Sequence, residues 1–270
     1  MNMDVVAARG LVLLGCGKMG SAMLAGWLEG GLPSSSVWVQ DPYPSDWLTA
    51  TGVHLNEGFP ENPAVVLIAV KPQMMGEALP ALAALPKART VFLSVAAGVS
   101  IGAYEAALGG DASIVRAMPN TPAAVAKGIT AIIGNSNASN TDLDLADALL
   151  SAVGQVVRLS DESQMDAVTG VSGSGPAYIF YMIDALAAAG VAQGLPEELS
   201  MQLAKATVAG AGVLAETADE TPEQLRINVT SPNGTTQAGL EVLMGETALK
   251  PLMAKTVKAA TDRSRELGNG

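Results

Sequence analysis

The pattern of apolar and polar positions changes near residue 160. Before that point, short runs of Val, Ile and Leu alternate with segments of helical periodicity such as Lys18–Glu29 and Gln73–Ala84. The apolar runs are continuous, as expected for strands that are buried on both faces of a parallel sheet. These runs are Leu11–Gly15, Val37–Asp41, Val65–Val70, Thr90–Val95, Ser113–Ala117 and Ile129–Ile133. The repeated order of strand, helix and strand predicts a Rossmann-type doubly wound parallel sheet.

The second part of the chain has a different pattern. From Asp161 onward no segment has the pattern of a strand, and alanine-rich helical segments take over. They are Tyr178–Ala192, Glu197–Ala218, Glu223–Val229 and Thr236–Leu267, the last with a break near Gly245. Thr221 and Gln224 form a capping box before the third of these segments. The sequence therefore predicts an α/β domain over residues 1–160 and an all-α domain over residues 161–270.

The predicted helices are apolar around much of their circumference. Leu, Met, Val and Ala occupy most of positions 199–215. A thin helical layer of this kind has to bury its apolar surface against another molecule. We therefore expect a homo-oligomer in which the helical domain forms the interface.

The composition narrows the range of partners and compartments. With 15 Lys and Arg against 26 Asp and Glu, the formal net charge is −11, and an acidic chain repels nucleic acid and anionic lipid. No run of 18 apolar residues is present, and Asp4 and Arg9 interrupt the N-terminal segment, so neither a membrane span nor a signal peptide is predicted. Cys16 is the single cysteine, which excludes a disulfide within the chain and fits a cytoplasmic protein. No metal site is predicted.

A glycine-rich sequence follows the first predicted strand. Residues 15–20 are Gly-Cys-Gly-Lys-Met-Gly, a G-x-G-x-x-G sequence between a strand and a helix. The first glycine allows a tight turn, the second lets the backbone approach a pyrophosphate, and the third permits close packing of helix on strand. The start of the helix adds free N–H groups and the positive end of its dipole. We predict that Gly15, Gly17, Lys18, Met19 and Gly20 bind a dinucleotide, the alternative being a tight turn without a ligand.

Asp41 ends the second predicted strand, 21 residues after Gly20. An acidic residue at about this distance commonly binds the ribose 2′-OH of a dinucleotide. No Lys or Arg occurs between Lys18 and Lys71, so the additional phosphate of NADPH would lack a nearby cation and would face Asp41. These residues favour NADH over NADPH, unless Asp41 is only a turn residue before Pro42.

Candidate proton donors are few, and this bears on the reaction. Reduction of a ketone needs a proton donor, most often His, but His54, the single histidine, lies early in the first domain. The 3-hydroxyacid dehydrogenase family carries a glycine pattern like residues 170–175, followed by a catalytic Lys and an Asn, and here those two positions hold Ile179 and Met182. An imine that is already protonated accepts a hydride without a strong acid. Elimination therefore favours reduction of a C=N bond.

A second loop has the composition of an anion site. Residues 230–236 are Thr-Ser-Pro-Asn-Gly-Thr-Thr, and they precede the helical segment Gln237–Leu243. Small hydroxyl side chains and free backbone N–H groups at the start of a helix suit a substrate carboxylate. An ordinary Ser or Thr helix cap has the same composition, and spacing alone does not separate the two alternatives.

Four segments resemble those of pyrroline-5-carboxylate reductases, the enzymes that form proline, and they occur in the same order. They are residues 69–73 (Ala-Val-Lys-Pro-Gln), 116–122 (Arg-Ala-Met-Pro-Asn-Thr-Pro), 171–178 (Val-Ser-Gly-Ser-Gly-Pro-Ala-Tyr) and 230–240. Together with the glycine loop, the resemblance extends from residue 15 to residue 240. The last two segments are quite specific to that family.

The resemblance implies reduction of 1-pyrroline-5-carboxylate to L-proline with NADH or NADPH, the last step of proline biosynthesis. It implies cofactor contacts from Ala69, Val70, Lys71, Pro72, Pro119 and Asn120. It implies that the substrate is bound by Ser231, Asn233, Gly234, Thr235 and Thr236. The Thr236 hydroxyl would lie beside the ring nitrogen as the catalytic group. The resemblance also implies an intertwined homodimer of the helical domain, often assembled further into a ring of dimers.

The chain departs from the family pattern at two positions. Asn233 stands where Gly is usual, although Asn tolerates a positive φ better than most residues. Asp41 stands where a small polar residue is common, which bears on the choice of cofactor. Two further residues have simpler explanations, since Lys71 can be a solvated charge at a strand end and Arg116 can tie the two domains together.

Two other functions compete with an imine reductase. One is a hydroxyacid dehydrogenase of the same architecture, which Ile179 and Met182 disfavour. The other is a non-enzymatic regulator that senses a dinucleotide. Such regulators commonly carry an additional DNA-binding module, and the sequence shows neither an additional domain of that kind nor a basic face.

Overall fold

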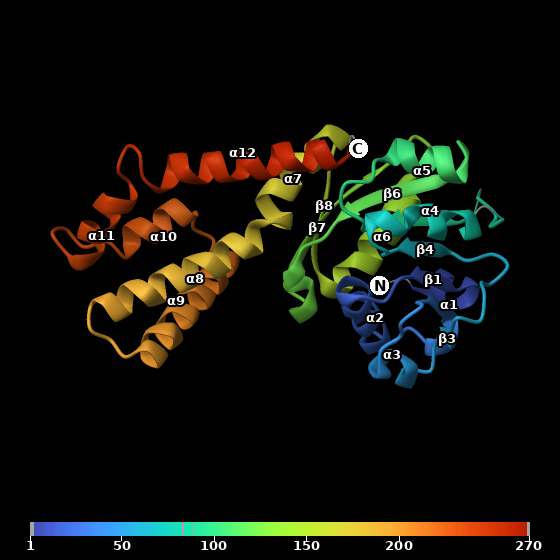
Figure 1. The fold of residues 1–270 in the computed structure, drawn as a ribbon, viewed down its shortest axis with the longest axis horizontal. Coiled ribbons are helices and arrows are strands. Elements are labelled where there is room, and N and C mark those ends of the chain that lie inside the picture. The colour runs from blue at the N-terminus through green and yellow to red at the C-terminus, as the bar shows by residue number, and fades with distance from the viewer. Residues whose placement is uncertain (1–2, 83, 88, 269–270) are drawn as a thin grey trace. The chain divides into compact units, whose positions relative to one another are not determined.

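A computed structural model describes residues 3–82, 84–87 and 89–268, and Figure 1 shows its elements. The chain forms two compact units. The first unit comprises Met1–Gly173 together with Ala260–Gly270, and the second comprises Ser174–Ala259. The chain therefore crosses between the units twice, once after Gly173 and once after Ala259.

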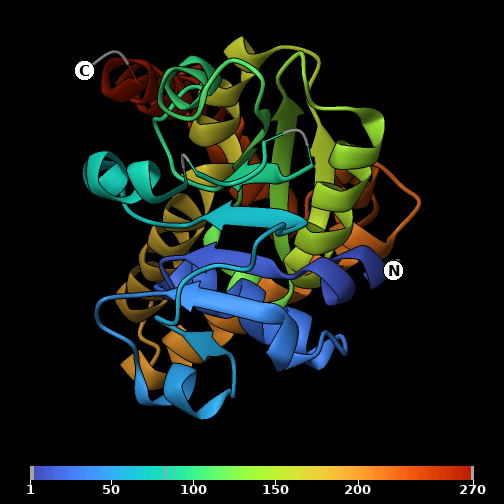
Figure 2. The ribbon, with the colours of Figure 1, turned by 90° about the vertical axis from the view of Figure 1, so that its right-hand side faces the viewer.

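The first unit contains a sheet in the order β3-β2-β1-β4-β5-β6-β7-β8, seen in Figure 2. The strands are β1 (Leu11–Leu14), β2 (Val37–Gln40), β3 (His54–Leu55), β4 (Val65–Ile68), β5 (Val91–Ser94), β6 (Ser113–Met118), β7 (Gly128–Gly134) and β8 (Gly154–Arg158). All six predicted strands are confirmed, with ends that differ by one or two residues. Sequence patterning missed β3, which has two residues, and β8, which carries the exposed Gln155 and Arg158.

The predicted Rossmann-type doubly wound parallel sheet is confirmed, with one antiparallel pair of strands that the sequence did not indicate. β7 runs antiparallel to β6, while β8 is parallel to β7. A parallel crossover needs a dozen or more residues, usually including a helix. Residues 119–127 between β6 and β7 hold only the 3₁₀ helix η4 (Thr121–Val125), so the chain turns back directly. The rest of the sheet, from β3 to β6, is parallel and doubly wound.

Helices cover both faces of the sheet with separate cores. On one face, α2 (Lys18–Glu29) and α6 (Asn140–Leu150) pack against residues such as Leu11 and Leu13. On the other face, α5 (Ile101–Leu108) and α4 (Met75–Ala78) pack against Val12 and Leu14. Successive residues of β1 thus enter different cores, which explains why its sequence is apolar without interruption. The remaining short helices of this unit are α1 (Asp4–Arg9), η1 (Ser34–Ser36), α3 (Asp46–Ala50), η5 (Ser151–Val153), η6 (Glu162–Gln164), α7 (Met165–Val168) and the π-helix η7 (Thr169–Gly173).

The single helix predicted over Gln73–Ala84 is divided into three short pieces. They are η2 (Pro72–Met74), α4 (Met75–Ala78) and η3 (Leu79–Leu82), and Ala83 lies outside the described residues. Pro80 has no N–H and its ring clashes with the carbonyl four residues earlier, so a regular α-helix cannot continue past it. Two apolar anchors, Met75 and Leu79, nevertheless hold the segment against the sheet.

The second unit is helical, as predicted, and no strand occurs after Asp161 in the described part of the chain. Its helices are α8 (Gly175–Ala192), α9 (Glu197–Thr217), α10 (Pro222–Asn228), α11 (Thr235–Leu243) and the first part of α12 (Leu249–Gly268). The break predicted near Gly245 is confirmed between α11 and α12. Thr221 caps α10 by accepting the Gln224 N–H at 3.2 Å, which confirms half of the predicted capping box. The reciprocal bond is not made among the described residues, and the Gln224 side chain donates to Asn228 instead.

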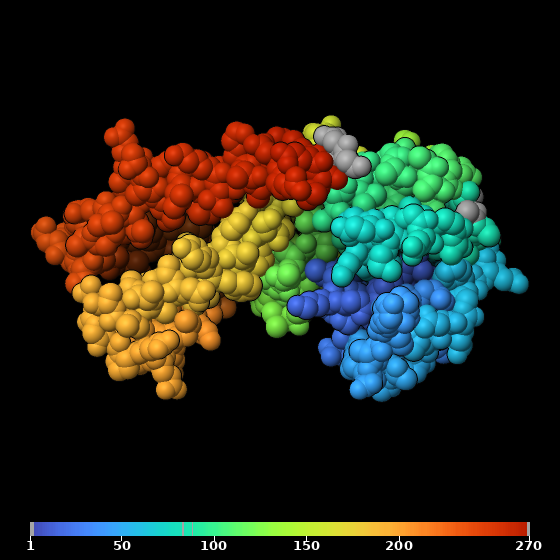
Figure 3. All heavy atoms as spheres, viewed as in Figure 1, coloured from blue at the N-terminus to red at the C-terminus, as the bar shows by residue number. Residues whose placement is uncertain are grey.

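This helical unit has almost no core of its own. Within it, α8 and α9 pack side by side, while α10, α11 and α12 make few contacts with them. The buried residues among Ser174–Ala259 are Ala187, Ser200 and Ala204. Large side chains such as Phe180 and Leu203 are about half exposed or more. The space-filling view shows a hollow between α8 and the first half of α12 (Figure 3).

Candidate functional site

The glycine loop joins β1 to α2, and its three glycines differ in their surroundings. Gly15 has φ = +83°, a left-handed conformation that favours glycine, and its N–H donates to the Gln40 carbonyl at 2.8 Å. Gly17 is the N-cap of α2, and a Cβ added to it would meet nothing within 4 Å. A Cβ on Gly20 would collide with the Gly15 carbonyl oxygen. The loop thus has the turn, the open approach and the close packing that a bound pyrophosphate requires.

Lys18 and Met19 begin helix α2 directly after the loop. No side chain caps this helix, so its first N–H groups face outward, and the Lys18 side chain is exposed. Such a helix start attracts an anion through its N–H groups and its dipole.

Asp41 is fixed to the glycine loop. Its Oδ2 accepts the Cys16 N–H at 2.7 Å and its Oδ1 accepts the Tyr43 N–H at 2.8 Å. Asn56 holds the Asp41 backbone from the other side through two hydrogen bonds of 2.9 Å. Burial, and to a lesser extent the Asp41 carboxylate, raises the pKa of the Cys16 thiol to about 11, so this thiol is neutral at physiological pH. The contact between Asp41 and Cys16 was not apparent from the sequence.

A groove of about 310 Å³ opens beside Asp41, at the carboxyl ends of β1, β2 and β4. Nucleotides bind at this edge of a doubly wound sheet. Its lining is mainly apolar, with a few polar groups, and consists of Leu14, Gln40, Asp41, Pro42, Asn56, Phe59, Val70, Met74, Glu77, Ala78 and Ala81. A groove of this size and composition fits the adenosine half of a dinucleotide.

The segment after β4 lies next to the glycine loop. Ala69 donates its N–H to the Leu14 carbonyl at 2.8 Å, and Val70 lies close beside Gly15. The Lys71 side chain is exposed and makes no hydrogen bond or ion pair among the described residues, while the Lys71 carbonyl accepts the Met74 N–H at 2.8 Å as η2 begins at Pro72. Ala69 and Val70 are therefore placed beside the loop, and the Lys71 ammonium is available to a ligand.

Pro119 and Asn120 are buried at the end of β6. The Asn120 carboxamide accepts the Ile129 N–H at 3.0 Å and donates to the Ser172 carbonyl at 3.2 Å. Both ends of this side chain are thus engaged in joining β7 and η7 to the end of β6. Asn120 shapes the site through the backbone that it holds.

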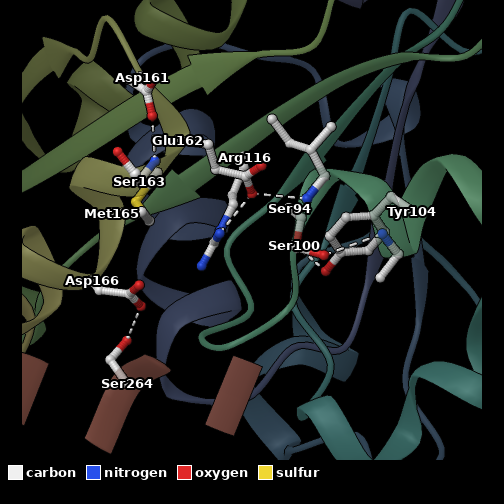
Figure 4. Close-up of polar contacts among 12 residues, drawn as sticks. Ser94, Ser100, Tyr104, Arg116, Asp161, Glu162, Ser163, Met165, Asp166 and Ser264 are labelled. Atoms are coloured by element: carbon white, nitrogen blue, oxygen red, sulfur yellow. Dashed lines mark hydrogen bonds and ion pairs between the residues drawn. The ribbon is translucent and has the colours of Figure 1, made fainter. Parts of the chain in front are cut away.

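A partly buried ion pair begins at Arg116, earlier on β6, as Figure 4 shows. Arg116 Nη1 donates to Glu162 Oε1 at 2.7 Å, and the same oxygen accepts the Ile101 N–H at 2.9 Å. Arg116 therefore pairs within the first unit, at the start of the segment that leads toward the helical unit. Nearby, Ser94 Oγ and the Tyr104 hydroxyl lie 2.5 Å apart, and burial raises the pKa of Tyr104. Sequence reasoning missed Glu162, whose partner lies 46 positions away, and Tyr104, whose partner Ser94 lies on another element ten positions away.

The loop of residues 230–236 leads into α11. Asn233 has φ = +58°, so it adopts the left-handed conformation that Gly would take in the family pattern. The Asn233 N–H donates to Gln237 Oε1 at 2.8 Å. Gly234 is the N-cap of α11, and no side chain caps this helix. The alternative of an ordinary Ser or Thr cap is therefore wrong.

The absence of a cap leaves the start of α11 open to a ligand. Thr235 and Thr236 are the first two residues of the helix and are exposed. Their N–H groups make no hydrogen bond among the described residues. Ser231 is exposed in the same loop, close against Gly234. Free N–H groups and hydroxyls at a helix start form a site for a carboxylate.

The residues that test the competing dehydrogenase are also placed. Ile179 and Met182 lie on α8, and neither acts as a proton donor because an aliphatic chain and a thioether carry no ionisable proton. His54 stacks on Trp38 with ring centroids 4.5 Å apart, and its Nδ1 lies 3.0 Å from Glu57 Oε2. These contacts give His54 a structural role at β3, the edge strand of the sheet.

The fold and the glycine loop define an oxidoreductase of the nicotinamide dinucleotide class. Comparison with known proteins agrees: residues 10–98 match the family model described as NADP oxidoreductase, coenzyme F420-dependent. Residues 162–267 match the model described as pyrroline-5-carboxylate reductase dimerisation. The pyrroline-5-carboxylate reductase of Pseudomonas aeruginosa is 36% identical over 95% of this chain and 96% of its own length. The chain belongs to the pyrroline-5-carboxylate reductase family.

Solved structures agree with this assignment. A pyrroline-5-carboxylate reductase from Coxiella burnetii superposes with a TM-score of 0.91 at 33% identity, covering 96% of this chain and 98% of the other. The Plasmodium falciparum pyrroline carboxylate reductase, solved with NADP bound, gives a TM-score of 0.82 at 29% identity over 96% and 98% of the two chains.

Either a membrane or another copy of the chain could cover the apolar surface of the helices. By length and composition, the helical stretch Glu162–Ala192 is able to cross a membrane, and very little of it is buried within the chain. The dimerisation model matches residues 162–267, which include this stretch. The match supports self-association as the covering of this surface.

Proposed function

We propose that this protein reduces 1-pyrroline-5-carboxylate to L-proline by hydride transfer from a nicotinamide dinucleotide, the last step of proline biosynthesis. The observation that carries the proposal is the uncapped start of α11 in the 230–236 loop, in a chain that also has an open glycine loop. Residues 1–160 serve as the dinucleotide-binding domain. Residues 161–270 serve as the substrate-binding and dimerisation domain, although the first part of this range, up to Gly173, and the last part, from Ala260, belong to the first compact unit.

The dinucleotide is held by the loop and the strand ends that surround it. Gly15, Gly17, Lys18, Met19 and Gly20 contact the pyrophosphate, and the start of α2 stabilises its charge. Asp41 contacts the ribose on the adenine side. The remaining contacts come from Ala69, Val70, Lys71, Pro72, Pro119 and Asn120. When bound, the dinucleotide supplies the hydride.

The substrate carboxylate binds at the start of α11. The free N–H groups of Thr235 and Thr236 donate to it, with Ser231, Asn233 and Gly234 shaping the loop. The Thr236 hydroxyl orients the ring nitrogen of the imine. Because hydride addition to a protonated imine gives a neutral amine, no strong acid is required beside it, in keeping with the absence of a free His or Lys in this loop.

The choice of cofactor follows from Asp41, and we propose a preference for NADH. To leave the path of a 2′-phosphate, Asp41 would have to give up the hydrogen bonds to Cys16 and Tyr43. The Ser45 hydroxyl accepts the Leu48 N–H as the cap of α3, and its own O–H could still donate to a phosphate. Opposing this preference, the Plasmodium relative is solved with NADP.

The assembly follows from the apolar helices. A homodimer, alone or within a ring of dimers, covers the surface that α8 and α9 expose. The net charge of −11 disfavours nucleic acid and anionic membranes as partners. A biosynthetic enzyme of this kind is expected in the cytoplasm.

One assay tests the function. Oxidation of NADH and of NADPH is followed by absorbance after adding 1-pyrroline-5-carboxylate, and separately after adding a panel of 2-keto acids. We expect oxidation with the imine and none with the keto acids. Oxidation with a keto acid alone would show a hydroxyacid dehydrogenase. No oxidation with any substrate, in a protein that binds dinucleotide, would show a sensor.

A further inference from the structure

The groove beside Asp41 contains a second carboxylate that the proposed contacts do not use. Among the described residues that line the groove, Asp41 and Glu77 are charged, and both are acidic. No Lys or Arg is among these lining residues. The groove therefore presents a negative potential to any group that enters it.

Glu77 has no structural task that would explain its place. Its side chain is exposed and makes no hydrogen bond and no ion pair among the described residues. It lies on α4, whose fixed position comes from the buried Met75 and Leu79 on either side of it. The packing of α4 thus keeps an unpaired carboxylate at the rim of the groove. Asp41, in contrast, is held by two backbone N–H groups.

We infer that Glu77 is a second determinant of cofactor specificity, which disfavours the 2′-phosphate of NADPH from its position on α4 in the lining of the groove. This inference rests on the proposed binding of a dinucleotide in the groove. NADH and NADPH share every contact except the phosphate, so a carboxylate at the rim changes their relative affinity. Because Glu77 is exposed, water and salt screen it, and Coulomb's law then gives about a two- to fivefold effect.

The test compares cofactor binding in the absence of substrate. Dissociation constants for NADH and for NADPH are measured by calorimetry with the full chain, for wild type, Glu77→Gln and Glu77→Lys. Glu29→Gln is the matched control, because the Glu29 side chain is also exposed and makes no hydrogen bond or ion pair among the described residues. This substitution changes the net charge equally and lies at the far end of α2 from the glycine loop. We expect the ratio of the NADPH constant to the NADH constant to fall about two- to fivefold in Glu77→Gln and further in Glu77→Lys.

Salt provides a second readout. In wild type the same ratio falls as ionic strength rises, and in Glu77→Gln it falls less. A ratio in Glu77→Gln that equals that of Glu29→Gln would overturn the inference, while leaving dinucleotide binding intact. Binding of neither cofactor by wild type would instead overturn the proposed function and this inference together. Retained NADH affinity in the variants shows that they are folded.

Discussion

Single residues decide how each ligand is received. Asn233 takes a positive φ in a loop where the family carries Gly, and the uncapped Thr235 and Thr236 follow it. Asp41 joins the end of β2 to the glycine loop through the Cys16 N–H. In both places, one side chain or backbone angle keeps donors or charge in a fixed position before a ligand arrives. Such preorganisation lowers the cost of binding.

Substituting Thr236 tests the role of its hydroxyl. In Thr236→Ala, turnover should fall about 10- to 100-fold, since a hydroxyl contact made in the transition state contributes roughly 1–3 kcal/mol. NADH affinity should not change, because Thr236 lies in the helical unit and the glycine loop lies in the other. Thr236→Ser is the control, and it should recover much of the turnover. Equal turnover in Thr236→Ala and wild type would remove this hydroxyl from the mechanism.

Substituting Asp41 tests the preference for NADH. Two like charges about 4 Å apart at an effective dielectric near 20 repel by about 4 kcal/mol, and even a quarter of that gives about a fivefold preference. We expect wild type to have the higher kcat/KM with NADH. The NADH to NADPH ratio should fall about fivefold in Asp41→Asn and in Asp41→Ser.

The two Asp41 variants also separate charge from structure. Asn keeps one oxygen that can accept the Cys16 or Tyr43 N–H, whereas Ser is too short to replace both contacts. Asp41→Asn should therefore keep NADH affinity better than Asp41→Ser. A wild-type preference for NADPH, or an unmoved ratio, would leave Asp41 as a turn residue only.

Some of these residues were predictable from sequence and others were not. Local spacing in the sequence was enough to predict the glycines, Asp41 and the 230–236 loop as site residues. Asn120 was implied by the family resemblance, but its bridge to Ile129 and Ser172 was not. The Arg116–Glu162 pair joins residues 46 positions apart. Contacts across such distances depend on the sheet order, which local pattern does not contain.

At the scale of elements, the loop between β1 and α2 requires glycine at two positions for two different reasons. Gly17 leaves space above the helix start for a ligand, whereas Gly20 leaves space for the Gly15 carbonyl. The first reason concerns binding and the second concerns packing. The same residue type therefore serves two purposes three positions apart.

Alanine at the two positions should separate these purposes. In Gly17→Ala the added methyl meets no protein atom within 4 Å, so the urea midpoint should stay within error of wild type. NADH affinity should fall about tenfold or more, because the methyl occupies the approach of the pyrophosphate. In Gly20→Ala the methyl collides with the Gly15 carbonyl, so stability should fall by about 1–3 kcal/mol together with affinity.

Urea unfolding and NADH titration of both variants check this expectation. Gly98→Ala does not serve as a control, because Gly98 has φ = +77°. Gly76→Ala is a better one, since Gly76 is helical and open space surrounds its Cβ position. The interpretation of the loop fails if Gly17→Ala binds NADH as wild type does.

The elements were largely predictable because each core strand is apolar along its whole length. The exceptions have local physical causes. Pro80 divided the predicted helix after β4, and the short connection over residues 119–127 reversed β7. The sequence did not predict β8 as a strand, because Gln155 and Arg158 are exposed and polar and its pattern is not that of a buried strand. Edge strands commonly differ from central strands in this way.

At the scale of the whole molecule, the helical unit does not bury its own apolar side chains. With Ala187, Ser200 and Ala204 as its buried residues, its stability has to come from another copy of the chain. Such a unit resembles half of a core, as expected of an obligate interface. The match to a dimerisation model over residues 162–267 agrees with this conclusion.

A charge placed on this surface should separate the copies. Leu203 lies on α9 and is 49% exposed in the single chain. In a symmetric dimer, Leu203→Glu introduces two charges into the interface, at a cost of several kcal/mol. Light scattering at micromolar concentration should show an oligomer for wild type and a smaller species for Leu203→Glu. Val5→Glu, on α1 of the first unit, is the control and should remain assembled.

The two chain crossings have a consequence for how the protein is made. Residues 260–268 belong to the dinucleotide unit, where Ser264 donates to Asp166 at 2.7 Å and Leu267 approaches Gly98. Domains generally fold in order as they leave the ribosome. Here the first unit is completed only after the whole helical unit has been translated. The nascent chain therefore emerges with a nucleotide-binding unit that still lacks its last helical segment, followed by an apolar helical unit.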